Sequence, residues 1–373
     1  MIKIKNLTKS YKNTVVLDNI NLNISKGELF VLIGASGCGK TTLLKMINKL
    51  ILPTKGDILM NNKSIYDQNS IKLRRNIGYV VQQTGLFPHM TVRENIELVS
   101  KLEGKTDDEL IVKTKELLNM VDLEPEKYMD RYPSELSGGQ QQRVGVARAF
   151  ATDSDIILMD EPFSALDPIT RVELQDKLFA IQQDLKKTII FVTHDMDEAI
   201  KLASRICILN KGNVLQVDTP YEILKNPANK YVEDFIGSNK FWTSPEFIKA
   251  DDIMITNPVV ANINHSVIQA IKIMRSNKVD GLVIVDRFNN YQGTVRLTHL
   301  QSITNKDILL SNVLFNKFPT VSSNEHFSNI LNIFHTKGLS SIPVVDQGKL
   351  KGLITKSNLL SILINQLDEE VCV

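Results

Sequence analysis

The feature that most constrains the fold is a glycine-rich turn between an apolar run and a helical pattern. The apolar run "ELFVLI" ends at Ile33, "GASGCGKT" follows it from Gly34 to Thr41, and "TTLLKMINKL" continues with helical spacing. The turn fits G-x-x-x-x-G-K-[ST] in the strand, loop and helix context that this phosphate-binding motif requires. We therefore expect a mostly parallel α/β layer with a phosphate site at the end of one strand.

This turn offers both backbone donors and side chains to a nucleoside triphosphate. Its N–H groups lack intrahelical partners and face the β-phosphate, while Lys40 reaches the β- and γ-phosphates and the Thr41 hydroxyl binds Mg²⁺. Cys38 is either a reactive thiolate, favoured by the helix start and Lys40, or an inert small residue. The residues predicted to contact ATP through the turn are Gly34, Ala35, Ser36, Gly37, Cys38, Gly39, Lys40, Thr41 and Thr42.

Residues outside the turn complete the predicted site. "IILMDEP" ends an apolar run with Asp160, expected near the metal, and Glu161, the candidate base for the attacking water. His194, which ends "TIIFVTHD", either contacts the γ-phosphate and the water or caps a helix. Gln82 is either a contact to water and Mg²⁺ or a surface amide, and Tyr11 either stacks on adenine or packs.

A second glycine turn, "LSGGQQQR" from Leu136 to Arg143, also precedes a helical pattern and also suits an anion. It stands far along the chain from the first turn. One chain therefore carries two candidate phosphate-binding turns. Nothing in the sequence between them indicates that the two turns lie close together in the fold.

Length, charge and cysteine content bound the remaining possibilities. The 373 residues suffice for two or three domains, and 44 Lys and Arg against 42 Asp and Glu argue against a basic nucleic-acid surface. Three cysteines without CxxC spacing predict neither a disulfide framework nor a zinc site, and suit a reducing cytosol. No uncharged apolar window is long enough to span a bilayer, so we expect another chain to supply any spanning segment.

The chain divides into an alternating α/β region and a repeated module. The apolar positions of one predicted helix recur 60 residues later, and "GLVIVD" recurs as "SIPVVD" at the same offset. Two copies imply a paired module. The predicted bounds are 1–236 for the α/β region, 237–250 for a linker, 251–304 and 305–366 for the repeats, and 367–373 for an acidic tail.

Together these motifs resemble the nucleotide-binding subunits of ABC transporters. The chain carries, in that family's order and spacing, "GASGCGKT", Gln82, "LSGGQ", "ILMDEP", "SALD" from Ser164 to Asp167, and His194. The resemblance covers about 235 residues and implies a P-loop ABC ATPase domain, with a RecA-like core and a helical subdomain, that uses ATP and Mg²⁺.

In that family the second glycine turn does not contact the ATP of its own chain. Two subunits face head to tail, so that the turn, at the positive end of a helix, closes on the γ-phosphate held by the partner. The resemblance thus implies a homodimer in which ATP holds the two chains together. The contacts that it implies in trans are Ser137, Gly138, Gly139, Gln140 and Asp167.

One branch of the family is resembled more closely: the ATPases of importers for glycine betaine, carnitine or choline. "LRRNIGYVVQQTGLFPHMTV" and the repeat carry this likeness. It implies integral-membrane permease subunits as partners, an extracellular solute-binding protein as an indirect partner, and a peripheral place on the cytoplasmic face of the membrane. "LFPHMTV" matches the segment that lies under a permease helix, with a plain surface loop as the alternative.

Two other functions stay open on the sequence alone. The first is a soluble ABC ATPase without a transport role, although a single cassette without a coiled-coil insert is unlike those proteins. The second is an importer ATPase for another small polar solute.

The repeat resembles a tandem pair of CBS domains, which implies a regulatory module. In such pairs an Asp three residues after a Thr or Ser contacts ribose, but here Asn358 follows Thr355, and Arg296 and His299 stand at the matching positions. These departures argue against simple AMP or ATP binding. Cyclic di-AMP, ionic strength and a purely structural role remain as alternatives. Residues 251–366 carry 11 Lys and Arg against 7 Asp and Glu, a small excess for a membrane-contact sensor, which favours the dinucleotide.

Overall fold

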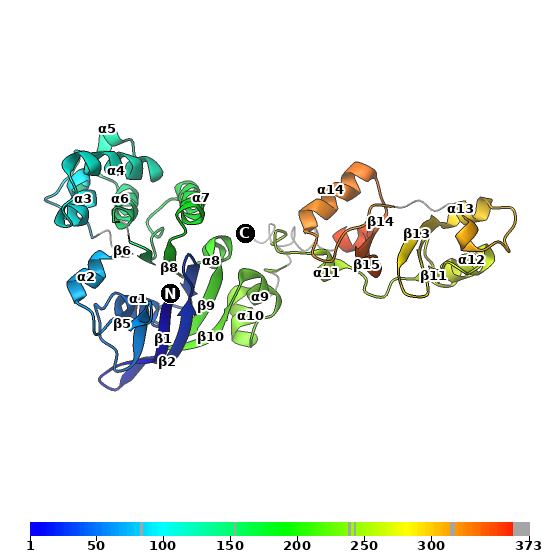
Figure 1. Cartoon of the computed structure of the whole chain (residues 1–373), viewed down its shortest axis with the longest axis horizontal. Helices are drawn as coiled ribbons and strands as arrows, with labels where there is room; N and C mark the ends of the chain where they lie inside the picture. The colour runs from blue at the N-terminus through cyan, green and yellow to red at the C-terminus, as the bar shows by residue number, and fades with distance from the viewer. Residues whose placement is uncertain (83–84, 153, 238–239, 242–243, 314–317, 361–373) are drawn as a thin grey trace. The chain divides into compact units, whose positions relative to one another are not determined.

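The computed structural model describes residues 1–373 apart from 83–84, 153, 238–239, 242–243, 314–317 and 361–373. The chain forms two compact units, Met1–Ile236 and Gly237–Val373, which we describe separately (Figure 1). The acidic tail expected over 367–373 and the end of the second repeat lie outside the described residues.

A six-stranded, mostly parallel sheet organises the first unit. Its strands are β3 (Leu29–Ile33), β6 (Ile77–Val80), β7 (Ile156–Asp160), β8 (Thr188–Thr193), β9 (Arg205–Asn210) and β10 (Asn213–Asp218), in the spatial order β10-β9-β3-β8-β7-β6. Only β10 pairs antiparallel with its neighbour in this sheet. Every residue of β3, β7 and β8 is buried, as expected of apolar strands covered on both faces.

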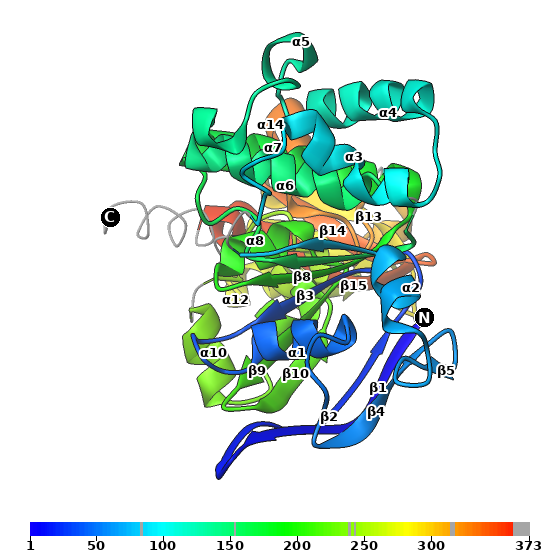
Figure 2. The ribbon, with the colours of Figure 1, turned by 90° about the vertical axis from the view of Figure 1, so that its left-hand side faces the viewer.

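A second, antiparallel sheet covers the helix that follows the phosphate-binding turn. It consists of β1 (Ile2–Tyr11), β2 (Thr14–Ile24), β4 (Lys55–Met60) and β5 (Lys63–Ser64). The helix α1 (Lys40–Ile47) lies between the two sheets (Figure 2). Leu7 of β1, Leu44 of α1 and Leu32 of β3 belong to one apolar cluster, so α1 is fixed from both sides.

The helices between β6 and β7 gather in a separate helical subdomain (Figure 1). They are α3 (Val92–Leu102), α4 (Asp107–Met120), α5 (Pro125–Tyr128), the 3₁₀ turn η1 (Pro133–Glu135) and α6 (Gly138–Phe150). The other helices of this unit are α2 (Ser70–Arg75), α7 (Pro168–Leu185), α8 (Met196–Leu202), α9 (Pro220–Lys225) and α10 (Lys230–Ile236). An α/β core with a helical subdomain agrees with the fold predicted from the sequence.

The second unit repeats one arrangement of strands and a helix. The first copy contains β11 (Val260–Asn262), α12 (Val267–Ser276), β12 (Gly281–Val285), β13 (Tyr291–Arg296) and α13 (Leu297–Ser302), and the second contains η2 (Leu310–Asn312), α14 (Phe327–Lys337), β14 (Ser341–Asp346) and β15 (Lys349–Thr355). Ala261 pairs in parallel with Ile284, and Val321 pairs in parallel with Val344, which keeps the offset of 60. The predicted paired module is confirmed.

Part of the segment predicted as a linker packs into the second unit. Ile248 is fully buried, and its carbonyl accepts the N–H of Phe327 at 2.9 Å. The N–H of Ala250, where α11 (Ala250–Ile253) begins, donates to Glu325 O at 2.9 Å. Polar residues around Pro245 are typical of a linker, but the buried Ile248 that follows them anchors this segment to the second repeat.

Candidate nucleotide site

The phosphate loop, Gly34–Thr41, joins β3 to α1 as a closed turn. Gly39 caps α1 with a φ of 106°, a left-handed conformation that glycine adopts without strain. A Cβ atom on Gly34 would lie 2.1 Å from the carbonyl oxygen of Leu209, so only glycine fits there. The Lys40 ammonium donates to Gly34 O at 2.6 Å and to Ala35 O at 3.1 Å. The loop therefore bonds to its own lysine.

The middle of the phosphate loop is open to solvent. Ala35, Ser36 and Gly37 are exposed, while Thr41 and Thr42 are half-buried at the start of α1. The backbone of residues 35–37 is thus accessible to a ligand, whereas Lys40 is buried beneath the loop.

An oxygen-rich corner lies where α1 meets the end of β7. Thr41 Oγ1 donates to Asp160 Oδ1 at 2.9 Å. Asp160 is 2 % exposed, and burial raises the pKa of its carboxyl although the Thr41 hydrogen bond opposes that rise. A carboxylate and a hydroxyl are hard oxygen ligands, and a divalent cation would stabilise the buried negative charge. The residues at this corner fit a magnesium ion.

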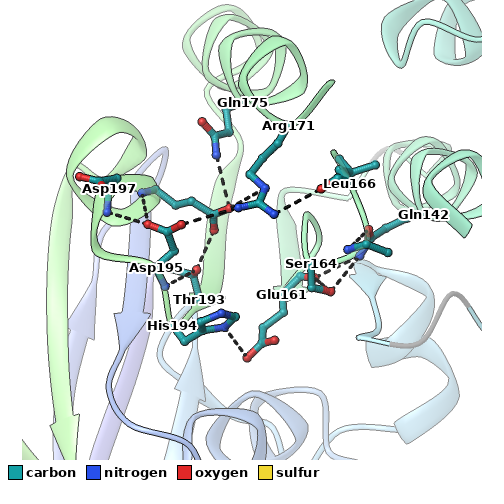
Figure 3. A network of polar contacts seen from close by, with 12 residues as sticks. Gln142, Glu161, Ser164, Leu166, Arg171, Gln175, Thr193, His194, Asp195 and Asp197 are labelled. Atoms are coloured by element: carbon teal, nitrogen blue, oxygen red, sulfur yellow. Dashed lines mark hydrogen bonds and ion pairs between the residues drawn. The ribbon is translucent and has the colours of Figure 1, made fainter. Parts of the chain in front are cut away.

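Glu161 follows β7 and meets two of the predicted site residues. Its φ of 48° lies in the left-handed region, which is uncommon for a residue with a side chain. Its Oε2 accepts from Gln82 Nε2 at 3.1 Å. Its Oε1 lies 3.4 Å from His194 Nδ1 (Figure 3). A pocket of about 60 Å³ beside Glu161 and His194 has room for water.

The capping alternative for His194 is not what the structure shows. The neighbouring Asp195 caps α8, because its Oδ1 accepts the N–H groups of Asp197 at 2.8 Å and Glu198 at 3.3 Å. The His194 side chain is 65 % exposed and reaches Glu161 instead.

The signature turn, Ser137–Gln140, forms the start of α6 and faces solvent. Ser137 Oγ accepts from Gln140 N at 3.3 Å, and Gln140 Oε1 accepts from Ser137 N at 2.9 Å, which is a capping box. Ser137 and Gly138 are exposed, and a Cβ atom on Gly138 would meet nothing within 4 Å. The positive end of α6 is therefore presented outward.

The remaining predicted contacts of the first unit differ in exposure. Tyr11 is 47 % exposed at the end of β1, with Lys9 Nζ 4.7 Å from its ring centroid. Asp167 is exposed and accepts from Thr170 N at 3.0 Å, and its bonds to Thr170 lower the pKa of its carboxyl. Cys38 is 6 % exposed and packs in the apolar core, which favours the inert interpretation of this thiol.

Comparisons with known proteins follow this geometry. The family described as ABC transporter matches residues 17–164, and the family described as CBS domain matches 250–304 and 306–365. The chain is 46 % identical to the choline transport ATP-binding protein OpuBA of Bacillus subtilis, over 98 % of this chain and 97 % of that one. The chain belongs to the ATP-binding subunits of ABC transporters. It carries a CBS pair, so both parts of the predicted fold are confirmed.

A second relative and a solved structure are also similar to this ABC subunit. It is 47 % identical to the carnitine transport ATP-binding protein OpuCA of Listeria monocytogenes, over 98 % of this chain and 93 % of that one. The solved dimeric structure of MJ0796, a bacterial ABC transporter cassette, is 38 % identical with a TM-score of 0.56, over 59 % of this chain and 99 % of that one. Within its described residues, this subunit has no helix long and apolar enough to cross a membrane.

Two of the three candidate residues of the CBS pair bond to each other. Thr355 Oγ1 donates to Asn358 Oδ1 at 2.5 Å, and Asn358 N donates to Thr355 Oγ1 at 3.4 Å, so these two side chains cap a helix start. Arg296 is exposed, and its guanidinium carbon lies 5.9 Å from the Phe318 ring centroid. Arg296, Phe318 and Thr294 line a cleft of about 20 Å³, the space of about one water.

Two side chains, Gln142 and Arg171, contact the segment 161–167, which begins with Glu161. Neither side chain was singled out from the sequence. Gln142 lies on α6 four residues before Val146 and seven before Ala149, both buried, so helical periodicity could have placed it on the buried face. A buried amide needs partners, and this was the available signal. Arg171 gave no signal, because a charged residue near a helix start reads as solvated surface.

Proposed function

We propose that the chain is the ATP-hydrolysing motor subunit of an importer for quaternary-amine solutes such as glycine betaine, carnitine or choline. The observation that carries the proposal is the assembly of Thr41, Glu161 and His194 at the ends of three neighbouring strands, in a chain whose signature turn faces outward. The names of the relatives, which give choline, carnitine and glycine betaine transport, support this class of solute.

The chemistry of hydrolysis is assigned to six side chains. Thr41, Asp160 and Gln82 would hold Mg²⁺, which neutralises phosphate charge. Lys40 exchanges its contacts with loop carbonyls for phosphate oxygens. Glu161 accepts the proton of the attacking water. His194 contacts the γ-phosphate from the end of β8.

The second glycine turn acts on the partner's nucleotide in this proposal. Ser137, Gly138, Gly139 and Gln140 present the open, positive end of α6, which suits a γ-phosphate arriving from outside the chain. Exposed Asp167 lies at the start of α7 on the same dimer face in this arrangement. The MJ0796 cassette, a relative in fold and sequence, is a dimer and has a post-hydrolysis dimeric form bound to ADP and Pi.

A rigid loop supports docking to a membrane permease. Asn95 is fully buried, and its Nδ2 donates to the carbonyls of Phe87 at 3.1 Å, Met90 at 3.1 Å and Thr91 at 3.0 Å. Phe87 stays 42 % exposed on this ordered loop. We propose that the segment 86–92 docks on the permease. The subunit would then lie at the cytoplasmic face of the membrane and act with a solute-binding protein indirectly.

Uptake by the assembled transporter tests this function. Cells lacking their own quaternary-amine uptake, supplied with the chain and the permease genes beside it, should accumulate labelled choline, carnitine or glycine betaine. The chain with Glu161→Gln should not support uptake. Uptake of none of the three solutes, or failure of the chain to co-purify with a membrane protein, would favour a soluble ATPase or another solute.

We also propose that the CBS pair binds cyclic di-AMP. Arg296 supplies an exposed cation and Phe318 an apolar wall, but the cleft within one chain is too small for a nucleotide. Two chains would therefore have to form the site together. Thr355 and Asn358 already bond to each other, so we expect them to contribute less than Arg296 to binding of the dinucleotide.

Calorimetry on the full chain tests the regulatory proposal. Cyclic di-AMP should release heat on binding at both low and high salt, and Arg296→Ala should weaken that binding. No heat at either salt removes the dinucleotide. ATPase activity of the assembled transporter that changes with salt alone would then favour ionic strength as the signal, through screening of the positive module.

A further inference from the structure

Gln142 is a buried amide that joins the signature helix to the catalytic segment of the same chain. It is 2 % exposed on α6. Its Nε2 lies 3.2 Å from Glu161 O and 3.4 Å from Ser164 Oγ, and its Oε1 accepts from Ala165 N at 3.0 Å (Figure 3). Both ends of the amide therefore bond to the segment 161–167.

The first turn of α6 touches the same segment independently of Gln142. A Cβ atom on Gly139 would lie 3.2 Å from Leu166 Cδ2 and 3.5 Å from Ala165 O. The helix start and the segment are thus in close contact at two positions, one turn apart. A shift of α6 along its start would have to move the segment or break these contacts.

Arg171 holds the other side of the segment. Its Nη2 donates to Leu166 O at 3.3 Å, its Nη1 lies 3.8 Å from Asp195 Oδ2, and its Nε lies 4.0 Å from Glu198 Oε1 (Figure 3). Asp195 directly follows His194 in the chain. The segment 161–167 is therefore clamped between α6 on one side and the residues beside His194 on the other.

We propose that Gln142 is a positioning residue that makes the two ATP sites of the dimer depend on each other. The inference rests on the proposed function, in which the start of α6 contacts the partner's nucleotide while Glu161 acts on the chain's own. Gln142 bonds directly to the backbone of Glu161 and to Ala165, so engagement of α6 sets the position of Glu161. A fully bonded buried amide has one arrangement, which suits it to transmit a shift.

The coupling predicts a specific kinetic pattern. ATP hydrolysis by the wild-type chain should be sigmoidal in ATP, with a Hill coefficient between 1 and 2, the number of sites. Gln142→Met keeps the length of the side chain and removes all three of its hydrogen bonds. This variant should lower kcat by about 10- to 100-fold, because a misplaced Glu161 is a poor base. Its Hill coefficient should fall to 1.

Gln182→Met is the matched control. Gln182 is also 2 % exposed, and its Nε2 donates to Gly27 O at 2.7 Å and Lys187 O at 3.3 Å, away from Glu161. A comparable loss of melting temperature is expected in both glutamine variants, but only Gln142→Met should change the Hill coefficient. Binding of a fluorescent ATP analogue to the separated subunit should stay within about twofold of wild type, since Gln142 touches none of Lys40, Thr41 and Asp160.

Two outcomes overturn the coupling. One is a Hill coefficient of 1 for the wild-type chain, and the other is a Gln142→Met variant that behaves as Gln182→Met does. Should Gln142→Met fail to fold, Gln142→Glu replaces it, since it keeps the size of the side chain and an oxygen to accept from Ala165 N but loses the donor to Glu161 O. A wild-type Hill coefficient and kcat in Gln142→Glu then overturn the proposal.

Mixed dimers separate this inference from the proposed function. A subunit with Lys40→Ala paired with one carrying Ser137→Arg should retain one working composite site. If that site works and Gln142→Met leaves the Hill coefficient unchanged, only the coupling is lost. If the composite site itself does not exist, the proposed function is at fault.

Discussion

The phosphate loop and the signature turn are both glycine-rich starts of helices. Only the phosphate loop is packed against other parts of its own chain. At Gly34 a Cβ atom would lie 2.1 Å from a backbone oxygen, and the neighbouring Lys40 is bonded within the loop. At Gly138 a Cβ atom would meet nothing within 4 Å, and Ser137 is exposed. The first turn is shaped by its own chain, whereas the second is exposed, as the proposed contact with a partner chain requires.

This difference separates two kinds of glycine. One glycine is required by the fold itself, because no other residue fits the space. At the other, a side chain would meet nothing within 4 Å in the single chain, so we expect glycine to matter there only when a partner approaches. Substitutions at the two turns should therefore affect different measurements, and a common effect would remove the distinction.

The largest effect is expected at Glu161, the proposed base for the hydrolysis of ATP. Glu161→Gln keeps the shape of the side chain but cannot accept the proton of the water, so kcat should fall by about 10²- to 10⁴-fold. ATP binding should persist, and dimers held by ATP should accumulate in gel filtration. Near-normal phosphate release by this variant would remove Glu161 from the role of base.

The paired glycine substitutions test the comparison itself. Gly34→Ala should abolish binding of a fluorescent ATP analogue and lower the melting temperature, since the methyl group must displace the backbone at Leu209. Gly138→Ala should leave both properties of the separated subunit unchanged and should impair hydrolysis only. Equal loss of ATP binding in the two variants would contradict the view that the signature turn does not contact the ATP of its own chain.

Thiol labelling should follow the same contrast. Cys38 is 6 % exposed within the apolar core, so maleimide should modify it slowly, and ATP should slow it further. Ser137→Cys, in a chain with Cys38→Ser and Cys372→Ser, should react fast. ATP should protect that thiol only when Glu161→Gln is also present, because only then does the closed dimer last. Rapid labelling of Cys38 in the wild-type chain would restore its reactive interpretation.

The smallest effect is expected from removal of the cap on α6. Ser137→Ala deletes the hydroxyl that accepts from Gln140 N and should cost about 1 kcal/mol in the free energy of unfolding. ATP binding to the separated subunit should not change. Denaturant unfolding measures the first quantity, and a loss well above this value would mean that Ser137 has structural contacts beyond its cap.

The same contrast explains what the sequence could and could not predict. Gly34, Lys40 and Thr41 follow a local motif, and local spacing was enough to place them beside one strand end. Glu161, Gln82 and His194 were separate candidates that only the family resemblance grouped, and the structure shows that they meet at one edge of the sheet. The family resemblance, and not any spacing, supplied the partner for Ser137.

Residues that act through packing were the ones missed. Gln142 and Arg171 carry no motif of their own, and their partners lie on segments that only the folded chain brings to them. In the CBS pair, Thr355 and Asn358 were singled out by spacing, but the structure uses that spacing for a helix cap. A side-chain pattern three residues apart suits a cap and a ligand contact equally, so the pattern alone could not decide.

The most direct test of the shared site uses dimers of two differently mutated chains. One subunit carries Lys40→Ala, and the other carries Ser137→Arg. If the signature turn acts in trans, both lesions fall on one composite site, and crosslinking of a photoreactive ATP analogue should show the other site intact. Placing both substitutions in the same chain, opposite a wild-type partner, should damage both sites. Equal labelling in the two arrangements would contradict the account.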